Sequence, residues 1–260
     1  MKNEIAIETH NLTVSYNRRP VLWKIDFEIP KGQIVGIIGP NGSGKTTLLK
    51  AIMGLVKYSS GYVKIFDQEL QEVREKISYV PQRESVDWDF PASVMDVVMM
   101  GRYRRGNLLR RLTKKDREIA VEALEKVNML EYSKRQISQL SGGQQQRVFI
   151  ARSLAQGADL YIMDEPFVGV DAATEEAIMQ LLIEMKNNGK TLVVVHHDLQ
   201  TAKLYFDWMV LLNTRLIAAG AKDEIFNEKL LQEAYGGKLN VLTKVGELLK
   251  EKDFPLREKH

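Results

Sequence analysis

Gly39-Pro40-Asn41-Gly42-Ser43-Gly44-Lys45-Thr46 lies between a short apolar run, Ile34–Ile38, and a segment with helical periodicity. It satisfies the pattern G-x-x-x-x-G-K-[ST] in the setting that gives the pattern meaning, with a strand before it and a helix after it. The glycines let the backbone curl so that successive N–H groups point at one anion, and the helix adds the positive end of its dipole. The sequence therefore predicts a phosphate-binding loop for a nucleoside triphosphate.

Two side chains of this loop have separate roles. Lys45 is long enough to reach the β- and γ-phosphates, and the Thr46 hydroxyl is a ligand for Mg²⁺. The alternative is a glycine-rich turn that merely caps a helix, which the flanking strand and helix disfavour. We expect contacts with the nucleotide from Gly39, Asn41, Gly42, Ser43, Gly44, Lys45, Thr46 and Thr47.

The composition of the 260 residues fits a folded soluble chain. Hydrophobic residues make up 44%, charged residues 27%, and the net charge is only +3, which excludes intrinsic disorder as the main description. The absence of cysteine excludes a disulfide scaffold, a thiolate metal site and thiol catalysis. Neither a signal peptide nor a membrane-spanning apolar run is visible, so we expect a cytoplasmic protein that is soluble on its own.

Apolar runs alternate with helical patterns along the chain, which favours a buried parallel sheet with crossover helices. The clearest strands are 34–38, 160–163 and 192–195, and the expected helices are 45–53, 113–127, 142–156 and 172–187. Period-2 alternation in about 1–30 and 61–80 predicts a small antiparallel sheet, and 84–156 reads as an inserted helical lobe. The expected fold is an α/β P-loop NTPase core over 1–225 with these two additions, followed by a helical, charged tail over 226–260.

Polar residues follow two of these strands, where open α/β sheets bind their ligands. Asp164 is placed to hold Mg²⁺, and Glu165 to act as general base or to orient the attacking water. Without the phosphate-binding loop, the same pair could be a solvated acidic turn. His196 and His197 end the next strand, where a histidine can donate to a phosphate oxygen, although spacing does not indicate which one acts.

A second anion site is predicted at Leu140-Ser141-Gly142-Gly143-Gln144-Gln145-Gln146-Arg147, where a serine N-cap and two glycines open a helix. One nucleotide already has its loop, so this helix start suggests binding across a dimer, with each chain completing the site of the other. The alternative is an ordinary glycine-relaxed helix start.

Together these segments resemble the ATP-binding cassette (ABC) ATPases over nearly the whole chain, with 140–144 similar to the signature motif of that family. The resemblance implies that Ser141, Gly142, Gly143 and Gln144 contact the ATP of the opposite protomer. It also implies that Tyr16 stacks on adenine, unless it is a core tyrosine, and that Gln82 contacts Mg²⁺ and links the two lobes. Asp171 would end the loop that communicates between protomers, with Val170 where leucine is usual, and His197 fits the switch histidine better than His196.

The segment after Gln82 resembles, together with 166–175, the ATPase subunits of bacterial importers for manganese, zinc or iron. Trp88, Phe90, Val94, Val98 and Met99 could form an apolar groove for a short helix of a transmembrane permease. For Val94 and Val98 we favour a core position, whereas Trp88 and Phe90 alternate with aspartates and look less like core. The resemblance implies a cargo metal held by the permease or by an extracytoplasmic binding protein, and a location at the cytoplasmic face of the membrane.

Two interpretations remain open at this stage. The first is a homodimeric ATPase that drives a permease; the second is a soluble ABC ATPase of a metallocluster-assembly or nucleic-acid machine. Residues 101–117 hold eight Lys or Arg against one acid, Asp116, which suits a solvated surface, anionic lipid or nucleic acid. Because the chain has neither tandem cassettes nor a coiled-coil insertion, we expect no nucleic acid as partner.

Overall fold

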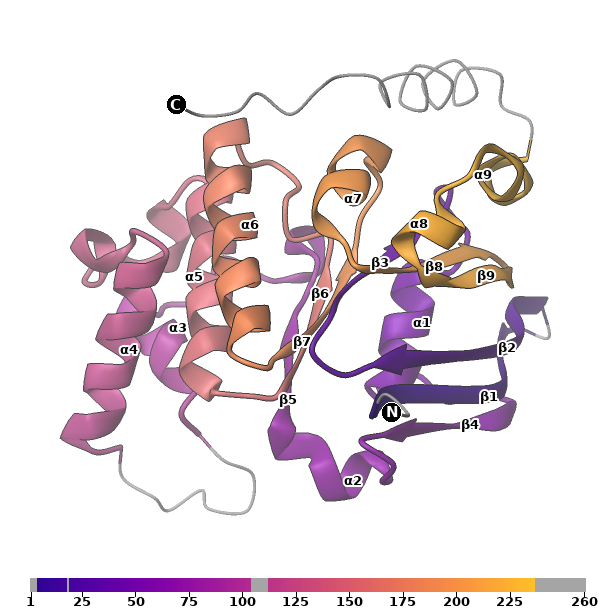
Figure 1. The fold of residues 1–260 in the computed structure, drawn as a ribbon. Coiled ribbons are helices and arrows are strands. Elements are labelled where there is room, and N and C mark those ends of the chain that lie inside the picture. The colour runs from indigo at the N-terminus through magenta and orange to yellow at the C-terminus, as the bar shows by residue number, and fades with distance from the viewer. Residues whose placement is uncertain (1–3, 18, 104–111, 237–260) are drawn as a thin grey trace.

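The computed structural model describes residues 4–17, 19–103 and 112–236. Its centre is a six-stranded sheet in the order β5-β6-β7-β3-β8-β9, parallel except for the antiparallel pair β8/β9 (Figure 1). The strands are β3 (Ile34–Ile38), β5 (Ile77–Val80), β6 (Leu160–Asp164), β7 (Thr191–Val195), β8 (Trp208–Asn213) and β9 (Arg215–Ala221). This confirms the predicted α/β fold with a mostly parallel core.

A smaller antiparallel sheet faces one side of this core. Its strands are β1 (Ile5–Tyr16), β2 (Arg19–Pro30) and β4 (Ser60–Ile65), in the order β2-β1-β4, and α1 (Lys45–Ile52) joins it to the large sheet (Figure 1). The expectation that all of 61–80 belongs to the small sheet is wrong for its second half. Residues 70–73 form the short helix α2, and β5 pairs in parallel with β6 because its apolar residues are needed at the edge of the large sheet.

Helices cover the other side of the large sheet. They are α3 (Val94–Met100), α4 (Lys114–Lys126), α5 (Gly142–Gln156), α6 (Ala172–Asn187), α7 (Leu199–Tyr205), α8 (Lys222–Ile225) and α9 (Glu228–Tyr235). In α3, α4 and α5, a Ser or Thr N-cap and the third helical residue hydrogen-bond each other's backbone. These capping boxes define where each helix begins. The first residues of the tail form α9, whereas 237–260 lie outside the described residues.

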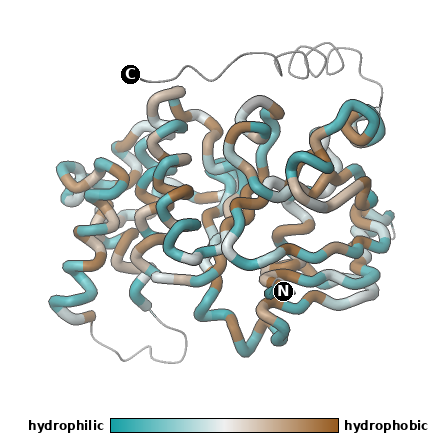
Figure 2. Tube along the Cα trace, in the orientation of Figure 1, coloured by the Kyte–Doolittle hydropathy of each residue, from teal (hydrophilic) through white to brown (hydrophobic). Residues whose placement is uncertain are grey.

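The alternation of side chains along the central strands produces two hydrophobic cores. In β6, Leu160 and Ile162 face the core shared with the small sheet and α1, whereas Tyr161 and Met163 face the core under the helices. All four are buried, as expected for a strand covered on both faces. Apolar residues follow these central strands in Figure 2, and the outer helices alternate between apolar and polar residues.

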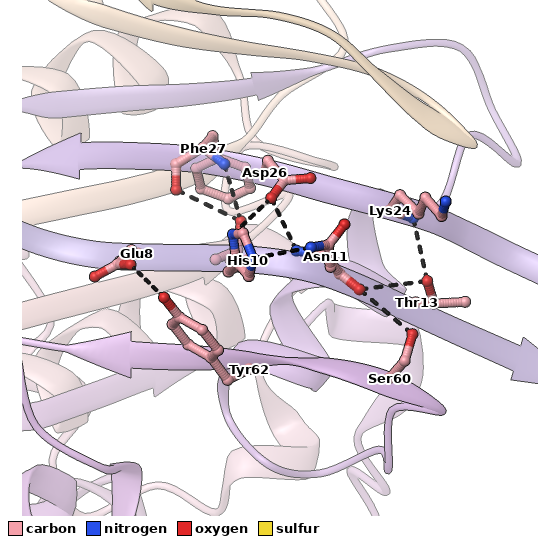
Figure 3. Close-up of polar contacts among 10 residues, drawn as sticks. Glu8, His10, Asn11, Thr13, Lys24, Asp26, Phe27, Ser60 and Tyr62 are labelled. Atoms are coloured by element: carbon pink, nitrogen blue, oxygen red, sulfur yellow. Dashed lines mark hydrogen bonds and ion pairs between the residues drawn. The ribbon is translucent and has the colours of Figure 1, made fainter.

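The small sheet carries a polar network on one exposed face (Figure 3). The His10 ring contacts Asp26 at 3.1 Å and the Asn11 amide at 2.8 Å, and it packs against Tyr62, whose hydroxyl donates to Glu8 at 2.8 Å. These contacts join β2, β1 and β4 across the pleat. Such exposed pairs contribute little stability individually, so they define the register more than they stabilise the sheet.

In the described part of the chain, no helix combines the length and the apolar composition needed to cross a bilayer.

Candidate nucleotide site

The phosphate-binding loop adopts a backbone that its glycines make possible. Gly42 and Gly44 have φ of 80° and 100°, in the left-handed region that side chains disfavour. At Gly39 a Cβ would lie 2.0 Å from the carbonyl oxygen of Leu212, so the loop can pass this close to β8 only without a side chain. The loop is fixed further by the turn after β8, because the Thr214 N–H donates to Ser43 O at 2.9 Å.

The side chain of Lys45 lies inside the phosphate-binding loop to which the residue belongs. Its Nζ donates to the carbonyl oxygens of Gly39 at 2.9 Å and Pro40 at 3.0 Å. Burial lowers the pKa of Lys45, and the negative charges of Glu165 and Asp164 counteract that shift. A buried ammonium group surrounded by backbone oxygens is well suited to exchange those contacts for phosphate oxygens.

Thr46 and Asp164 form a pair at the base of the site. The Thr46 hydroxyl donates to Oδ1 of Asp164 at 3.1 Å, and Asp164 is fully buried at the end of β6. Burial raises the pKa of Asp164, whereas the Thr46 hydrogen bond lowers it. Asp164 Oδ2 is buried and has no hydrogen-bond partner among the described residues. A hydroxyl and a buried carboxylate with a free oxygen form a donor set that fits Mg²⁺.

Glu165 begins the turn after β6 and is contacted by Gln82 from the end of β5. The Gln82 Nε2 donates to Oε2 of Glu165 at 3.0 Å. Glu165 has φ of 51°, a conformation that costs a residue with a side chain about 1–3 kcal/mol and is concentrated at functional sites. The strained turn directs the carboxylate towards the phosphate-binding loop rather than into the core.

These residues surround one cavity of about 470 Å³. Its volume is typical of a site for a small molecule or cofactor. Its walls are formed by Val21, Asn41, Gly42, Gly44, Lys45, Thr46, Thr47, Gln82, Glu165 and His197. The structure thus brings together the predicted phosphate-binding, metal-binding and water-activating residues, which come from the ends of β3, β5, β6 and β7.

The two histidines at the end of β7 have different environments. His197 is exposed and lines the cavity, whereas His196 is 3% exposed and packs edge-on against Phe167 and Phe206, with ring centroids 5.3 and 5.8 Å apart. Burial, followed by the charge of His197, lowers the pKa of His196 to about 4. His196 is therefore a neutral core residue, and His197 is the one that can reach a nucleotide.

Eight predicted nucleotide-binding residues do not line this cavity, and two of them, Gly39 and Ser43, belong to the phosphate-binding loop itself. Tyr16 ends β1 and is 46% exposed, and Asp171 caps α6 by accepting from the Thr174 N–H at 3.0 Å and the Thr174 hydroxyl at 2.9 Å. The Thr174 hydrogen bonds lower the pKa of Asp171. The remaining four lie at the partly exposed start of α5 and do not line the cavity, so this chain alone does not bring them to its own phosphate-binding loop; they are the N-cap Ser141 and the helical residues Gly142, Gly143 and Gln144.

Sequence reasoning missed one wall of the cavity. Val21 of β2 lines it, and the neighbouring Leu22 packs so closely that a Cβ on Gly44 would lie 2.6 Å from its Cδ2. No motif marks these residues, because an apolar residue in a strand has the same appearance whether it faces a core or a ligand. The approach of the small sheet to Gly44 was therefore visible only in three dimensions.

The segment after Gln82 is less exposed than its aspartates suggest. Trp88 and Phe90 are partly buried, and the Trp88 indole packs edge-on against Phe149 of α5 at 4.8 Å. Val94 and Val98 are fully buried, as expected for core residues. Trp88 and Phe90 thus pack against the core and remain partly exposed.

One residue of the basic stretch has a structural role. Arg102 forms an ion pair with Asp116 at 3.0 Å and donates to Ala155 O at 2.6 Å. Asp116 is 1% exposed, so this pair fastens the end of α3 to α4 and α5 rather than facing a ligand. Residues 104–111, which carry much of the remaining basic charge, lie outside the described residues.

A mostly parallel sheet defines a P-loop nucleoside triphosphatase when a phosphate-binding loop follows one strand, here β3, and a carboxylate pair stands at the end of another, here β6, with β7 between them. The family model described as "ABC transporter" matches residues 22–168, more than half of the chain. The chain belongs to the ABC transporter family. It is an ATPase subunit that couples ATP hydrolysis to transport.

Its relatives act in metal transport. The chain is 58% identical to the manganese transport system ATP-binding protein MntB of Bacillus subtilis over 91% of this chain and 94% of that protein. It is 55% identical to the zinc transport system ATP-binding protein TroB of Treponema pallidum over 90% of this chain and 88% of that protein. These relatives support the transporter interpretation over a soluble assembly or nucleic-acid machine.

Solved structures show the same fold. A metal-chelate type ABC transporter in an inward-facing conformation has a TM-score of 0.78 and 28% identity, covering 89% of this chain and 88% of its own. An ATP-binding cassette in a dimeric, post-hydrolysis state with ADP and Pi has a TM-score of 0.73 and 30% identity, covering 83% of this chain and 98% of its own. Both similarities extend over the large sheet and its additions.

Proposed function

We propose that this chain forms a dimer around two ATP molecules with Mg²⁺ and energises a permease that imports a divalent metal ion, manganese or zinc. The dimer is inferred from one observation: within one chain, the first turn of α5 does not line the cavity. A second copy, turned so that its Ser141–Gln144 turn meets this cavity, supplies the helix N-terminus that a γ-phosphate favours. The dimeric relative with ADP and Pi supports this arrangement.

Each cavity residue then has a distinct task. Lys45 neutralises charge on the β- and γ-phosphates, and the backbone of 39–46 donates N–H groups to them. Thr46, Asp164 and Gln82 would hold Mg²⁺, which would supply neutralisation of the phosphate charge. Glu165 orients the attacking water and accepts its proton, and His197 donates a hydrogen bond to the transferred phosphoryl group.

The remaining assigned residues complete the dimer. Tyr16 stacks on the adenine, and Asp171 lies in the loop that faces the other protomer. Ser141, Gly142, Gly143 and Gln144 bind the nucleotide of that protomer. We assign residues 1–225 to this ATPase domain and 226–260 to a tail.

The partner is a transmembrane permease that contacts the lobe near Trp88 and Phe90. Both rings are only partly buried, and Trp88 packs on Phe149 of α5, which supports this segment as the docking site. The chain then acts at the cytoplasmic face of the membrane. The metal reaches the permease from an extracytoplasmic metal-binding protein, and nucleic acid is not a partner.

The cargo follows from the relatives, which act in manganese and zinc transport systems. The test purifies a tagged Glu165→Gln chain with ATP from detergent-solubilised membranes and identifies its partners by mass spectrometry. We expect a polytopic membrane protein in stoichiometric amount. The native chain, reconstituted with that membrane protein in vesicles that enclose ATP, should then accumulate ⁵⁴Mn²⁺ or ⁶⁵Zn²⁺. Recovery of soluble partners alone would contradict the permease, and uptake of neither ion would contradict the cargo.

A further inference from the structure

The side chain of Arg83 joins two parts of the lobe that have separate roles in the proposed function. Arg83 follows Gln82 and opens residues 83–90, here called the docking segment. Its Nε donates to Oε1 of Gln145 in α5 at 3.2 Å. Gln145 is 4% exposed, and its Nε2 donates to Ile137 O at 3.1 Å, so the direction of its Oε1 is fixed. Arg83 is thus held by a buried side chain near the start of α5.

The Arg83 guanidinium also lies against the N-terminal residue of α5. A Cβ on Gly142 would lie 2.9 Å from both Cζ and Nε of Arg83, so the missing side chain at 142 permits this approach. A cation beside a helix N-terminus opposes the helix dipole, and the contact therefore does not stabilise α5 electrostatically. The contact instead fixes the position of the first turn of α5 relative to Arg83.

The docking segment has a second contact one helical turn further along α5. The Trp88 indole N–H donates to Arg83 O at 2.8 Å, and the Trp88 ring packs against Phe149. Residues 145 and 149 are four apart and so share one face of the helix. The docking segment therefore contacts this face twice, through the Arg83 side chain and through the Trp88 ring.

We propose that Arg83 is a positioning residue, which fixes the Ser141–Gln144 turn relative to the docking segment through Gln145. The inference rests on the proposed function, because this turn acts on the ATP held by a second copy. Movement of the docking segment is transmitted to the turn through the Arg83–Gln145 contact. A permease bound at Trp88 thereby controls how well the turn closes on the nucleotide of the opposite protomer.

The test measures dimerisation of the Glu165→Gln chain with Mg²⁺-ATP by sedimentation velocity, and the ATP affinity of the single chain at concentrations below dimerisation. Arg83→Met keeps most of the length but removes the charge and the donors. We expect it to weaken dimerisation about tenfold, the loss typical of a hydrogen bond with one charged partner, and to change ATP affinity less than twofold. Arg83→Lys, which keeps a cationic donor, should recover part of the loss.

A second variant separates positioning from a general structural effect. Gln145→Met removes the acceptor, so this variant alone should weaken dimerisation about tenfold. The double variant with Arg83→Met should show the same tenfold loss of dimerisation rather than a hundredfold loss. Arg117→Met, at an exposed arginine of α4, is the matched control and should change neither quantity. Thermal unfolding checks that each variant is folded.

The outcomes separate the two proposals. A Glu165→Gln parent that stays monomeric with ATP contradicts the proposed function. If the parent dimerises, the inference is overturned by an Arg83→Met chain that dimerises equally well. Losses that multiply in the double variant, or an ATP affinity that falls together with dimerisation, overturn it as well.

Discussion

Gln82 donates its amide N–H to Oε2 of Glu165 at 3.0 Å, so the proposed metal ligand and the proposed base are hydrogen-bonded to each other. The amide reaches from the end of β5 to the turn after β6, two adjacent parallel strands. Were the Gln82 side chain to turn to a bound Mg²⁺, the Glu165 carboxylate would lose this donor and would become a stronger acceptor for water. One hydrogen bond would then couple binding of the metal nucleotide to activation of the base.

The first prediction concerns Glu165→Gln. The amide keeps the shape and can still orient water, but it cannot accept a proton, so we expect phosphate release to fall by about 10²–10⁴-fold. ATP affinity should stay within about threefold, because Glu165 is not a phosphate ligand. Phosphate release and equilibrium binding of ATP measure the two effects. A variant that hydrolyses ATP at the native rate would show that another group activates the water.

The second prediction concerns Lys45→Ala. The substitution removes the charged donor that now binds Gly39 O and Pro40 O and that the phosphates require. We expect ATP affinity to fall by about ten- to a hundredfold, as for the loss of a charge-assisted contact. Lys57→Ala, at an exposed lysine beyond α1, is the control and should bind normally. Near-native affinity of the Lys45 variant would refute the proposed phosphate contact.

The third prediction concerns Asp164→Asn, which should stabilise the chain while abolishing hydrolysis. Burial raises the pKa of Asp164 above 3.8, so the folded state disfavours the ionised carboxylate and loses stability above that pKa. The amide removes this penalty, and we expect a higher Tm without nucleotide. The loss of a Mg²⁺ ligand should reduce hydrolysis at least a hundredfold. Calorimetry and phosphate release measure these effects, and a lower Tm would contradict the argument.

The fourth prediction separates the two histidines by pH. The pKa of His196 is lowered from 6.5 to about 4 in the folded chain, so the unfolded state binds its proton first as pH falls. The contribution of neutral His196 to the free energy of unfolding is therefore fully present above pH 6.5. It is lost progressively towards pH 4, with a loss of about 2 kcal/mol at pH 5 for this group alone. His196→Phe should reduce that loss in urea unfolding at pH 7.5 and 5, whereas His197→Ala should leave it in place and slow hydrolysis. Equal pH dependence in the native and His196→Phe chains would refute the assignment.

The fifth prediction concerns the contact with the permease. Trp88→Ala combined with Phe90→Ala should keep ATP affinity within about twofold, because neither ring lines the cavity. The same chain should lose the membrane protein that accompanies the Glu165→Gln parent in detergent. Leu204→Ala is the control, at a large apolar residue of α7 that is 72% exposed, and this variant should retain the membrane protein. Retention of the partner by the double variant would place the contact elsewhere.

The phosphate-binding loop and the ends of β6 and β7 were predictable because short-range patterns determine them. Glycine spacing, an apolar strand and the acidic or histidine pair that follows are all visible within about ten residues. Which face of a strand end meets the ligand was not predictable, and this is why spacing could not choose between His196 and His197. The choice depends on Phe167 and Phe206, which pack against the His196 ring from other segments of the chain, after β6 and after α7.

Contacts between residues that are far apart in the chain could also not be predicted from the sequence. The apolar composition of residues 77–80 would suit a strand of either sheet, and only their pairing with β6 assigns them to the large sheet. Likewise, Arg102 reads as one member of a basic surface stretch until the buried Asp116 is seen beside it. In both cases the deciding partner lies far away in the chain or on another element.

The strand that leads into the phosphate-binding loop is paired on both sides with strands that come much later in the chain. β3 lies between β7 and β8, and the loop itself is fastened by the Thr214 N–H on Ser43 O. On a ribosome, which synthesises the chain from its N-terminus, the loop emerges well before the strands and the turn that enclose it. A nascent chain that ends before residue 214 therefore carries the complete motif without all of the contacts that shape it. The ATP site is complete only after residue 214 has been synthesised.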